Sequence, residues 1–196
     1  HSPFHYRVAG AGDTDWVRNA SGVLAGERPT AEPLMEQLRA EPWPPQGAEP
    51  VDPDWIPTHI AAAAGLEYGP SFCGTERAWR RGDTVFSEVA LDPAIDPGGY
   101  TVHPGLMDAI GHAGLACLMW PELDSDPSRG KLLFRWGGVR FHDVVRPGPL
   151  RVIAVSKGED TIAIAALDSD GNPVVSVDEA VMRSYDVTQF RTTLSA

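Results

Sequence analysis

The sequence has few cysteines, few basic residues and no long apolar run, and each shortage excludes a class of protein. Two cysteines, Cys73 and Cys117, are too few for a disulfide framework. The longest apolar stretches, near Ile60–Gly65 and Ala113–Trp120, are far shorter than the roughly 18 residues of a membrane helix. Lysine and arginine total 16 against 27 acidic residues, a net charge of -11, without any basic cluster. We therefore expect no membrane span and no nucleic-acid partner.

Two further absences concern location and metals. The first residues lack a basic, apolar leader that ends in small residues, so we expect cytoplasmic residence. The six histidines show no metal-ligand spacing. The run Asp168–Pro173 carries acidic residues like the start of a calcium loop, but Pro173 stands where such a loop needs glycine. This run therefore predicts a hairpin turn between two strands, and we expect no bound metal.

What the sequence does contain, 42% hydrophobic and 22% charged residues, is typical of a globular protein with one or two small domains. Residues 1–24 alternate weakly between apolar and polar and predict two short strands joined by a turn. Residues 25–54 are rich in proline and predict a semi-rigid linker, in which Glu32–Arg39 forms one or two helical turns. Residues 55–186 predict a compact domain, followed by a tail over 187–196.

The compact domain combines two helix candidates with a series of strands. Trp55–Ala64 predicts a short helix, and Pro104–Trp120 a long one that is the most apolar in the chain. Strand patterns occur at Thr84–Leu91, Leu132–Phe134, Gly138–His142, Leu150–Ser156, Thr161–Leu167 and Val174–Arg183. An antiparallel sheet wrapped around the long helix would bury that helix on nearly every side. We therefore predict an α+β fold of this kind.

Two polar side chains interrupt the long apolar helix. Asp108 and His112 are four residues apart, so they project from the same side and can touch one substrate group. Helix geometry alone leaves two interpretations open, a hydrogen-bonded pair at the rim of a core or a functional site.

Several motifs together resemble the dehydratase domain of modular, type I polyketide synthases. They are Gly65–Phe72, Trp79–Asp83, His103–His112, Leu133–Arg140, Asp168–Val177 with Arg183, Trp43–Asp52 and Trp16–Leu24. The resemblance extends over residues 4–186. It implies a double hotdog, two sheet-wrapped helices fused in tandem, of which this chain would be the later part.

The resemblance also implies an origin for each segment. Residues 1–24 would be the last strands of an otherwise missing N-terminal hotdog, and 25–54 the linker. Residues 55–186 would be the complete C-terminal hotdog. We therefore expect a fragment of a longer dehydratase. Its parent would be a homodimer, with other synthase domains and an acyl carrier protein as partners.

The reaction implied by the resemblance is elimination of water from a β-hydroxyacyl thioester. The substrate would be carried on the phosphopantetheine of the acyl carrier protein, and no further cofactor is expected. By the family pattern Asp108 protonates the departing hydroxyl, His112 helps to hold it, and Tyr68 orients the acid. Such an acid needs its proton near neutral pH, which an apolar tunnel favours and a helix N-terminus opposes. We also predict a set of substrate contacts, namely Gly69, Pro70, Phe72, Leu106 and Trp136.

One part of the family pattern has no counterpart here. The family's base is a histidine of the first hotdog, within a His-x-x-x-Gly-x-x-x-x-Pro pattern, and none of the six histidines begins that pattern. Without a positioned base the reaction loses a contribution of roughly 10²–10⁴-fold. We therefore expect the isolated chain to be inactive, although its parent would be a hydro-lyase.

Four alternative functions stay open on the same scaffold. Two are a pyran-forming cyclase and a double-bond isomerase, since related domains differ by small changes around this site. A third is a hotdog thioesterase, which would release a free acid. The fourth is a non-catalytic half-domain that binds acyl chains or supports dimerisation.

Overall fold

The computed structural model describes residues 2–8, 17–26, 32–55, 58, 67–119, 129–142 and 148–186. They belong to two compact units, His1–Glu32 and Pro33–Ala196, which we describe separately. None of the described helices is long and apolar enough to cross a membrane. The expected tail over 187–196 and most of the expected helix Trp55–Ala64 lie outside the described residues.

The first unit is a two-stranded antiparallel ribbon, which confirms the two strands expected there, whereas the expected turn lies outside the described residues. Strand β1 (Ser2–Val8) pairs with β2 (Val17–Leu24), and the register shifts between Tyr6 and Arg7. The Phe4 ring covers Gly22, where an added Cβ would lie 2.5 Å from the ring. Phe4 and Tyr6 are nevertheless exposed. A ribbon of two strands has no core of its own, so this unit contributes little stability by itself.

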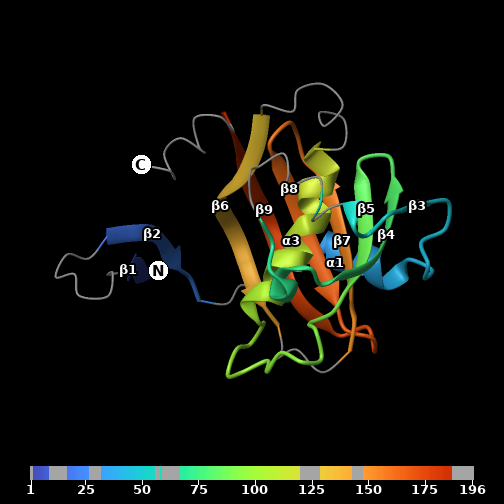
Figure 1. The fold of residues 1–196 in the computed structure, drawn as a ribbon, viewed down its shortest axis with the longest axis horizontal. Helices are drawn as coiled ribbons and strands as arrows, with labels where there is room; N and C mark the ends of the chain where they lie inside the picture. The colour runs from blue at the N-terminus through green and yellow to red at the C-terminus, as the bar shows by residue number, and fades with distance from the viewer. Residues whose placement is uncertain are drawn as a thin grey trace. The chain divides into compact units, whose positions relative to one another are not determined.

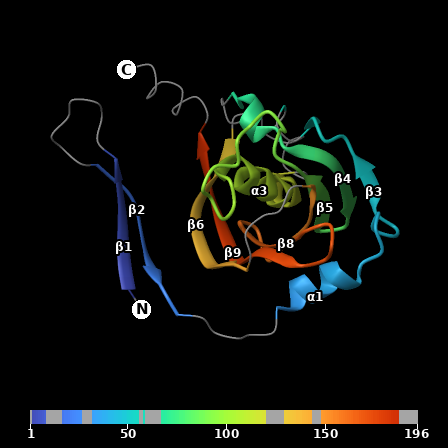
Figure 2. The same ribbon diagram turned by 90° about the horizontal axis from the view of Figure 1, so that it is seen from below.

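The second unit is a seven-stranded sheet curved around one helix, as Figures 1 and 2 show. The strand order is β3-β4-β5-β7-β8-β9-β6, and all neighbouring pairs are antiparallel. The strands are β3 (Glu49–Val51), β4 (Thr75–Arg81), β5 (Thr84–Val89), β6 (Arg129–Phe141), β7 (Leu150–Ser156), β8 (Thr161–Leu167) and β9 (Pro173–Asp186). The central helix is α3 (Pro104–Met119). The expected sheet around the long helix is therefore present.

The sheet is buried on both faces in its middle strands, which explains why their sequences are nearly continuous apolar runs. On the concave face, side chains such as Val85, Val152 and Ile164 pack with α3 in the main core. Their sequence neighbours point the other way. Phe86 and Ile153 form a second apolar cluster on the convex face.

The convex cluster is covered by a helix from the proline-rich range. Helix α1 (Pro33–Ala40) places Met35 and Leu38, each 2% exposed, on this cluster. Figure 2 shows α1 on the side of the sheet opposite α3. The predicted helical turns at Glu32–Arg39 are therefore present and are attached to the sheet. Further along the same range, β3 adds an edge strand beside β4.

Two strand expectations differ from the structure. The predicted strands Leu132–Phe134 and Gly138–His142 are one strand, β6. Gly138 has a φ of 62° that side chains rarely adopt, and it continues the strand where the sequence suggested a break. Strand β4 was not predicted, because Ala78 is its one fully buried residue and its other positions are mostly polar.

The turn before β9 is the hairpin turn that the sequence predicts. Asp168 Oδ1 accepts hydrogen bonds from the backbone N–H groups of Asp170 and Asn172, at 2.9 and 2.8 Å. Its Oδ2 accepts one from the Asn172 side chain at 3.0 Å. The Asp168 carboxylate thus closes the turn between β8 and β9.

Candidate functional site

The candidate acid lies near the N-terminal end of α3. Pro104 is the first residue of the helix, where its missing N–H costs nothing. The His103 ring accepts the Gly105 N–H at Nδ1, at 3.1 Å. Asp108 follows one turn later in α3, the helix around which the sheet curves (Figure 1). The start of α3 therefore holds Asp108 in a fixed place against the sheet.

Asp108 and His112 lie together but leave hydrogen-bonding capacity unused. Asp108 Oδ2 is 3.2 Å from His112 Nε2, within ion-pair distance. The direction of the N–H does not make a hydrogen bond, so among the described residues Oδ2 and both His112 ring nitrogens have no hydrogen-bond partner. The His112 side chain is 1% exposed, whereas that of Asp108 is 42% exposed. Buried polar atoms without partners are uncommon, and a ligand is one explanation for them.

Tyr68 approaches this pair from the segment before the short 3-10 helix η2 (Pro70–Phe72). Its ring meets the His112 ring edge to face, with 4.9 Å between ring centroids. Burial, together with the negative charge of Asp108, raises the pKa of Tyr68 to about 12. The phenol therefore stays protonated at neutral pH. The structure gives no hydrogen bond between Tyr68 and Asp108, and the expected orienting contact stays a prediction.

An apolar cavity of about 350 Å³ opens beside Asp108. The helix side is formed by Pro104, Met107, Asp108, Gly111 and Leu115, with Phe72 from η2. The sheet side is formed by Leu133, Trp136, Ile162, Ile164, Ala180 and Met182. Asp108 is the one charged residue of this described lining. The cavity size is within the usual range for small-molecule sites, and its wall is mostly apolar.

The structure brings some of the predicted substrate contacts to this cavity and places others elsewhere. Phe72 and Trp136 line it, and both are partly exposed. Gly69 and Pro70 are exposed at the start of η2 and are not part of the lining. Leu106 lies in the core and borders a different cavity, of about 540 Å³. Two positions along a helix correspond to a rotation of about 200°, so Leu106 and Asp108 face nearly opposite ways.

Several lining residues were not predicted from the sequence. Met107, Gly111 and Leu115 could have been predicted, because they are spaced four residues apart and lie along the helix beside Asp108. Sheet residues such as Ile162 and Met182 gave no local signal. Their place in the wall depends on how the sheet curves around the helix.

Most of the chain, including Asp108, His112 and Tyr68, matches a known protein family. Residues 36–192 match the family described as "Polyketide synthase dehydratase N-terminal domain". This chain belongs to the polyketide synthase dehydratase family. The family expected from the sequence motifs is therefore confirmed.

Individual relatives of this dehydratase agree with that assignment. The spectinabilin polyketide synthase system protein NorA' of Streptomyces orinoci is 39% identical over 179 residues, which are 91% of this chain and 5% of NorA'. The dehydratase domain from the terminal module of the rifamycin polyketide synthase is 30% identical, with a TM-score of 0.72, over 92% of this chain and 62% of that one. A structure on dehydratase substrate selection for the borrelidin and fluvirucin polyketide synthases is 33% identical, with a TM-score of 0.73, over 92% and 61%.

The likeness to these dehydratase structures confirms the α+β hotdog fold. The chain spans less than two thirds of each solved relative and a small part of the curated one. The assignment of its segments to the later part of a double hotdog stays a prediction.

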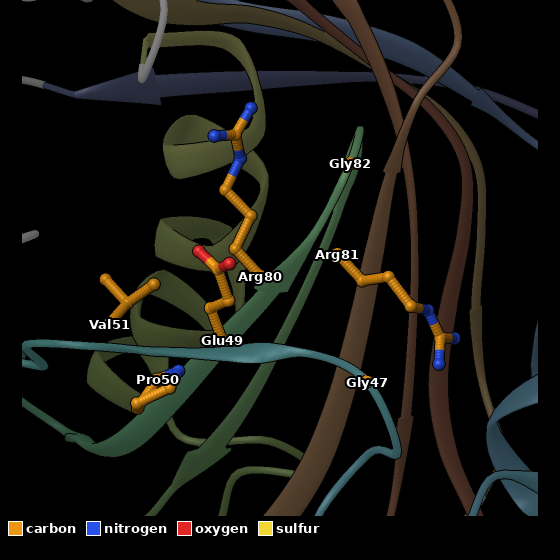
Figure 3. A pocket seen from close by; sticks show the side chains of 7 residues that line it. All are labelled: Gly47, Glu49, Pro50, Val51, Arg80, Arg81 and Gly82. Atoms are coloured by element: carbon orange, nitrogen blue, oxygen red, sulfur yellow. The ribbon is translucent and has the colours of Figure 1, made fainter.

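A second, polar cavity of about 250 Å³ lies at the β3–β4 edge of this dehydratase. Figure 3 shows Arg80 and Arg81 pointing to opposite sides of β4. The Arg81 guanidinium binds both Glu41 carboxylate oxygens, at 2.9 and 2.8 Å, and the Gln46 carbonyl at 2.8 Å. This hydrogen bonding lowers the pKa of Glu41 and raises that of Arg81. The charge of Arg81 is thus paired within the chain. At this cavity Arg81 therefore joins β4 to the segment that contains Glu41 and Gln46.

Among the described residues, no group of histidine, cysteine or carboxylate side chains could hold a metal ion.

Proposed function

We propose that this chain carries the acid half of a dehydratase site. The substrate is a β-hydroxyacyl thioester on an acyl carrier protein, and the product is the α,β-unsaturated thioester. We propose the carrier protein, other synthase domains and a second copy of the parent enzyme as partners, in the cytoplasm.

The observation that supports this function is the pair of polar side chains on the wall of an apolar cavity. Asp108 borders the cavity, and its Oδ2 has no hydrogen-bond partner within the described part of the chain. The adjacent His112 ring is buried with both nitrogens unused. An acyl chain fits the apolar wall, while its β-hydroxyl supplies both a donor and an acceptor for these side chains.

In the proposed reaction a base removes a proton from the α-carbon. That C–H electron pair forms the double bond to the β-carbon, and the C–O bond breaks. The departing hydroxyl takes a proton from Asp108 and leaves as water, so the acid ends as a carboxylate. His112 holds the oxygen through a ring nitrogen, and the protonated Tyr68 phenol limits water and positions the His112 ring from its edge.

The base is proposed to come from outside the motifs of this chain. None of the six histidines begins the family's His-x-x-x-Gly-x-x-x-x-Pro pattern. Division of the acid and the base between two hotdogs would leave the chain alone with little or no activity.

The test is formation of the unsaturated product by the parent enzyme from a β-hydroxyacyl thioester on its carrier protein. Asp108→Asn keeps the shape but has no acidic proton, so turnover should fall by about 10²–10⁴-fold. The turnover of Tyr68→Phe should fall less. Asp178→Asn is the matched control, because Asp178 is an exposed carboxylate that pairs with Arg140 and is not among the residues that line the cavity.

Three outcomes would contradict the proposal. Undiminished turnover by Asp108→Asn would remove Asp108 as the acid. Appreciable turnover by the isolated chain would show that the base lies within it. Release of a free acid would identify a thioesterase.

A further inference from the structure

The three glycines of α3 have different surroundings. A Cβ at Gly105 would lie 2.1 Å from the Ser71 carbonyl oxygen, and a Cβ at Gly114 would lie 1.9 Å from Ile162 Cδ1. Close packing therefore explains both. Within the part of the chain that the structure describes, a Cβ at Gly111 would have no such atom within 4 Å. Glycine destabilises a helix interior relative to alanine, so Gly111 has a cost that no neighbour in the structure explains.

The open space at Gly111 is part of the cavity beside the candidate acid. Gly111 lines that cavity between Met107 and Leu115, which lie one turn before and one turn after it. Asp108 is three positions earlier, and residues at this spacing have Cβ atoms about 5–6 Å apart. A side chain at position 111 would therefore occupy space next to the group that Asp108 touches.

We infer that Gly111 determines substrate specificity, an inference that rests on the proposed function. The absent side chain leaves room for a branch on a carbon directly bonded to the β-carbon. The substrate class is thus a β-hydroxyacyl thioester with an apolar branch at its α- or γ-carbon. A methyl branch buried against this apolar wall would improve binding by a factor of about four.

The experiment compares three substrates in the parent enzyme: straight-chain, α-methyl and γ-methyl β-hydroxyacyl thioesters. Gly111→Leu fills the open space, so kcat/KM for one or both branched substrates should fall at least tenfold more than for the straight chain. The branched substrate that loses more shows which carbon lies beside position 111.

Melting of the chain itself tests whether the space beside position 111 is open, and a melting transition of Gly111→Leu shows whether that variant folds. Gly111→Ala should raise Tm, because it improves helix propensity without a clash. Gly114→Ala is the matched control and should lower Tm, because its Cβ would meet Ile162.

The outcomes separate this inference from the proposed function. Failure of the wild-type parent to form an unsaturated product from any of the three substrates would overturn the proposed function, and the inference with it. Normal wild-type turnover with an equal effect of Gly111→Leu on all three substrates would overturn the inference alone. A fall in Tm for Gly111→Ala as large as that for Gly114→Ala would overturn it too.

Discussion

The indole N–H of Trp43 donates a hydrogen bond to the buried carboxylate of Glu88, 45 positions later in the chain. Arg77 binds the same carboxylate from β4. The Trp43 ring also meets the Trp79 ring edge to face, with 5.4 Å between centroids. This contact fixes the proline-rich range to the convex face of the sheet.

Replacing Trp43 with phenylalanine should therefore destabilise the fold. The variant loses a hydrogen bond to a charged acceptor, which is worth about 1.5–3 kcal/mol. Urea unfolding of wild type and Trp43→Phe measures the difference. A loss below about 0.5 kcal/mol, the usual scatter of surface substitutions, would mean that water replaces the indole at Glu88.

Replacing His112 with leucine should stabilise the fold while it reduces activity. The His112 ring is buried with two unpartnered nitrogens, each of which costs about 1–3 kcal/mol to bury. Loss of the ring contact with Tyr68 offsets part of that gain, by about 0.5–1.5 kcal/mol.

We expect a net gain in the free energy of unfolding for His112→Leu, measured in urea, because the two unpartnered nitrogens cost more than the lost ring contact contributes. His142→Leu is the control, since His142 Nε2 and Ser176 Oγ form a hydrogen bond of 3.0 Å. Removal of the His142 ring should therefore not raise the free energy of unfolding. A clear loss of stability in His112→Leu would show that the ring is hydrogen-bonded in solution.

Tyr68 should make the fold sensitive to alkaline pH. Burial raises its folded pKa to about 12 from the ordinary value of 10.0. The unfolded phenol thus loses its proton first, so this contribution is complete below pH 10.0 and is lost as the pH rises toward 12. Tyr68→Phe should flatten the fall in stability in that window and remove an absorbance step near pH 12. Tyr100→Phe, at an exposed tyrosine, should leave that step in place.

The two cysteines should react with an alkylating reagent at very different rates. Cys73 is exposed, whereas Cys117 is buried and its Sγ donates to the Ala154 carbonyl at 3.3 Å. Burial also raises the pKa of Cys117 to about 12, so almost no thiolate forms at pH 8. Mass spectrometry should find rapid labelling at Cys73 and labelling of Cys117 only after unfolding. Equal rates would mean that the core opens readily around α3.

The sequence alone predicted those elements that a pattern of neighbouring residues identifies. Strands β7 and β8 occur at the predicted residues, because both of their faces are apolar and turn residues limit each run. Asp108 and His112 were found as a pair because helical spacing places them together.

Other parts of the site depend on contacts that no local pattern carries. Leu106 belongs to the His103–His112 motif, but its side chain lies in the core. Ile162 lines the cavity from β8, which lies far from that motif in the sequence. Strand β4 has mostly polar positions, so its place in the sheet depends on pairing with β5. Curvature of the sheet brings these distant positions to one wall.

The apolar cluster on the convex face sets a practical limit on how this protein can be divided. A fragment that starts at residue 55 would lack Met35 and Leu38 and would leave Phe86, Ile153 and their neighbours open to water. Such a patch invites self-association. A fragment that starts at Pro33 retains the cover and the β3 edge. The solubility of the seven-stranded sheet thus depends on a helix that precedes its first strand.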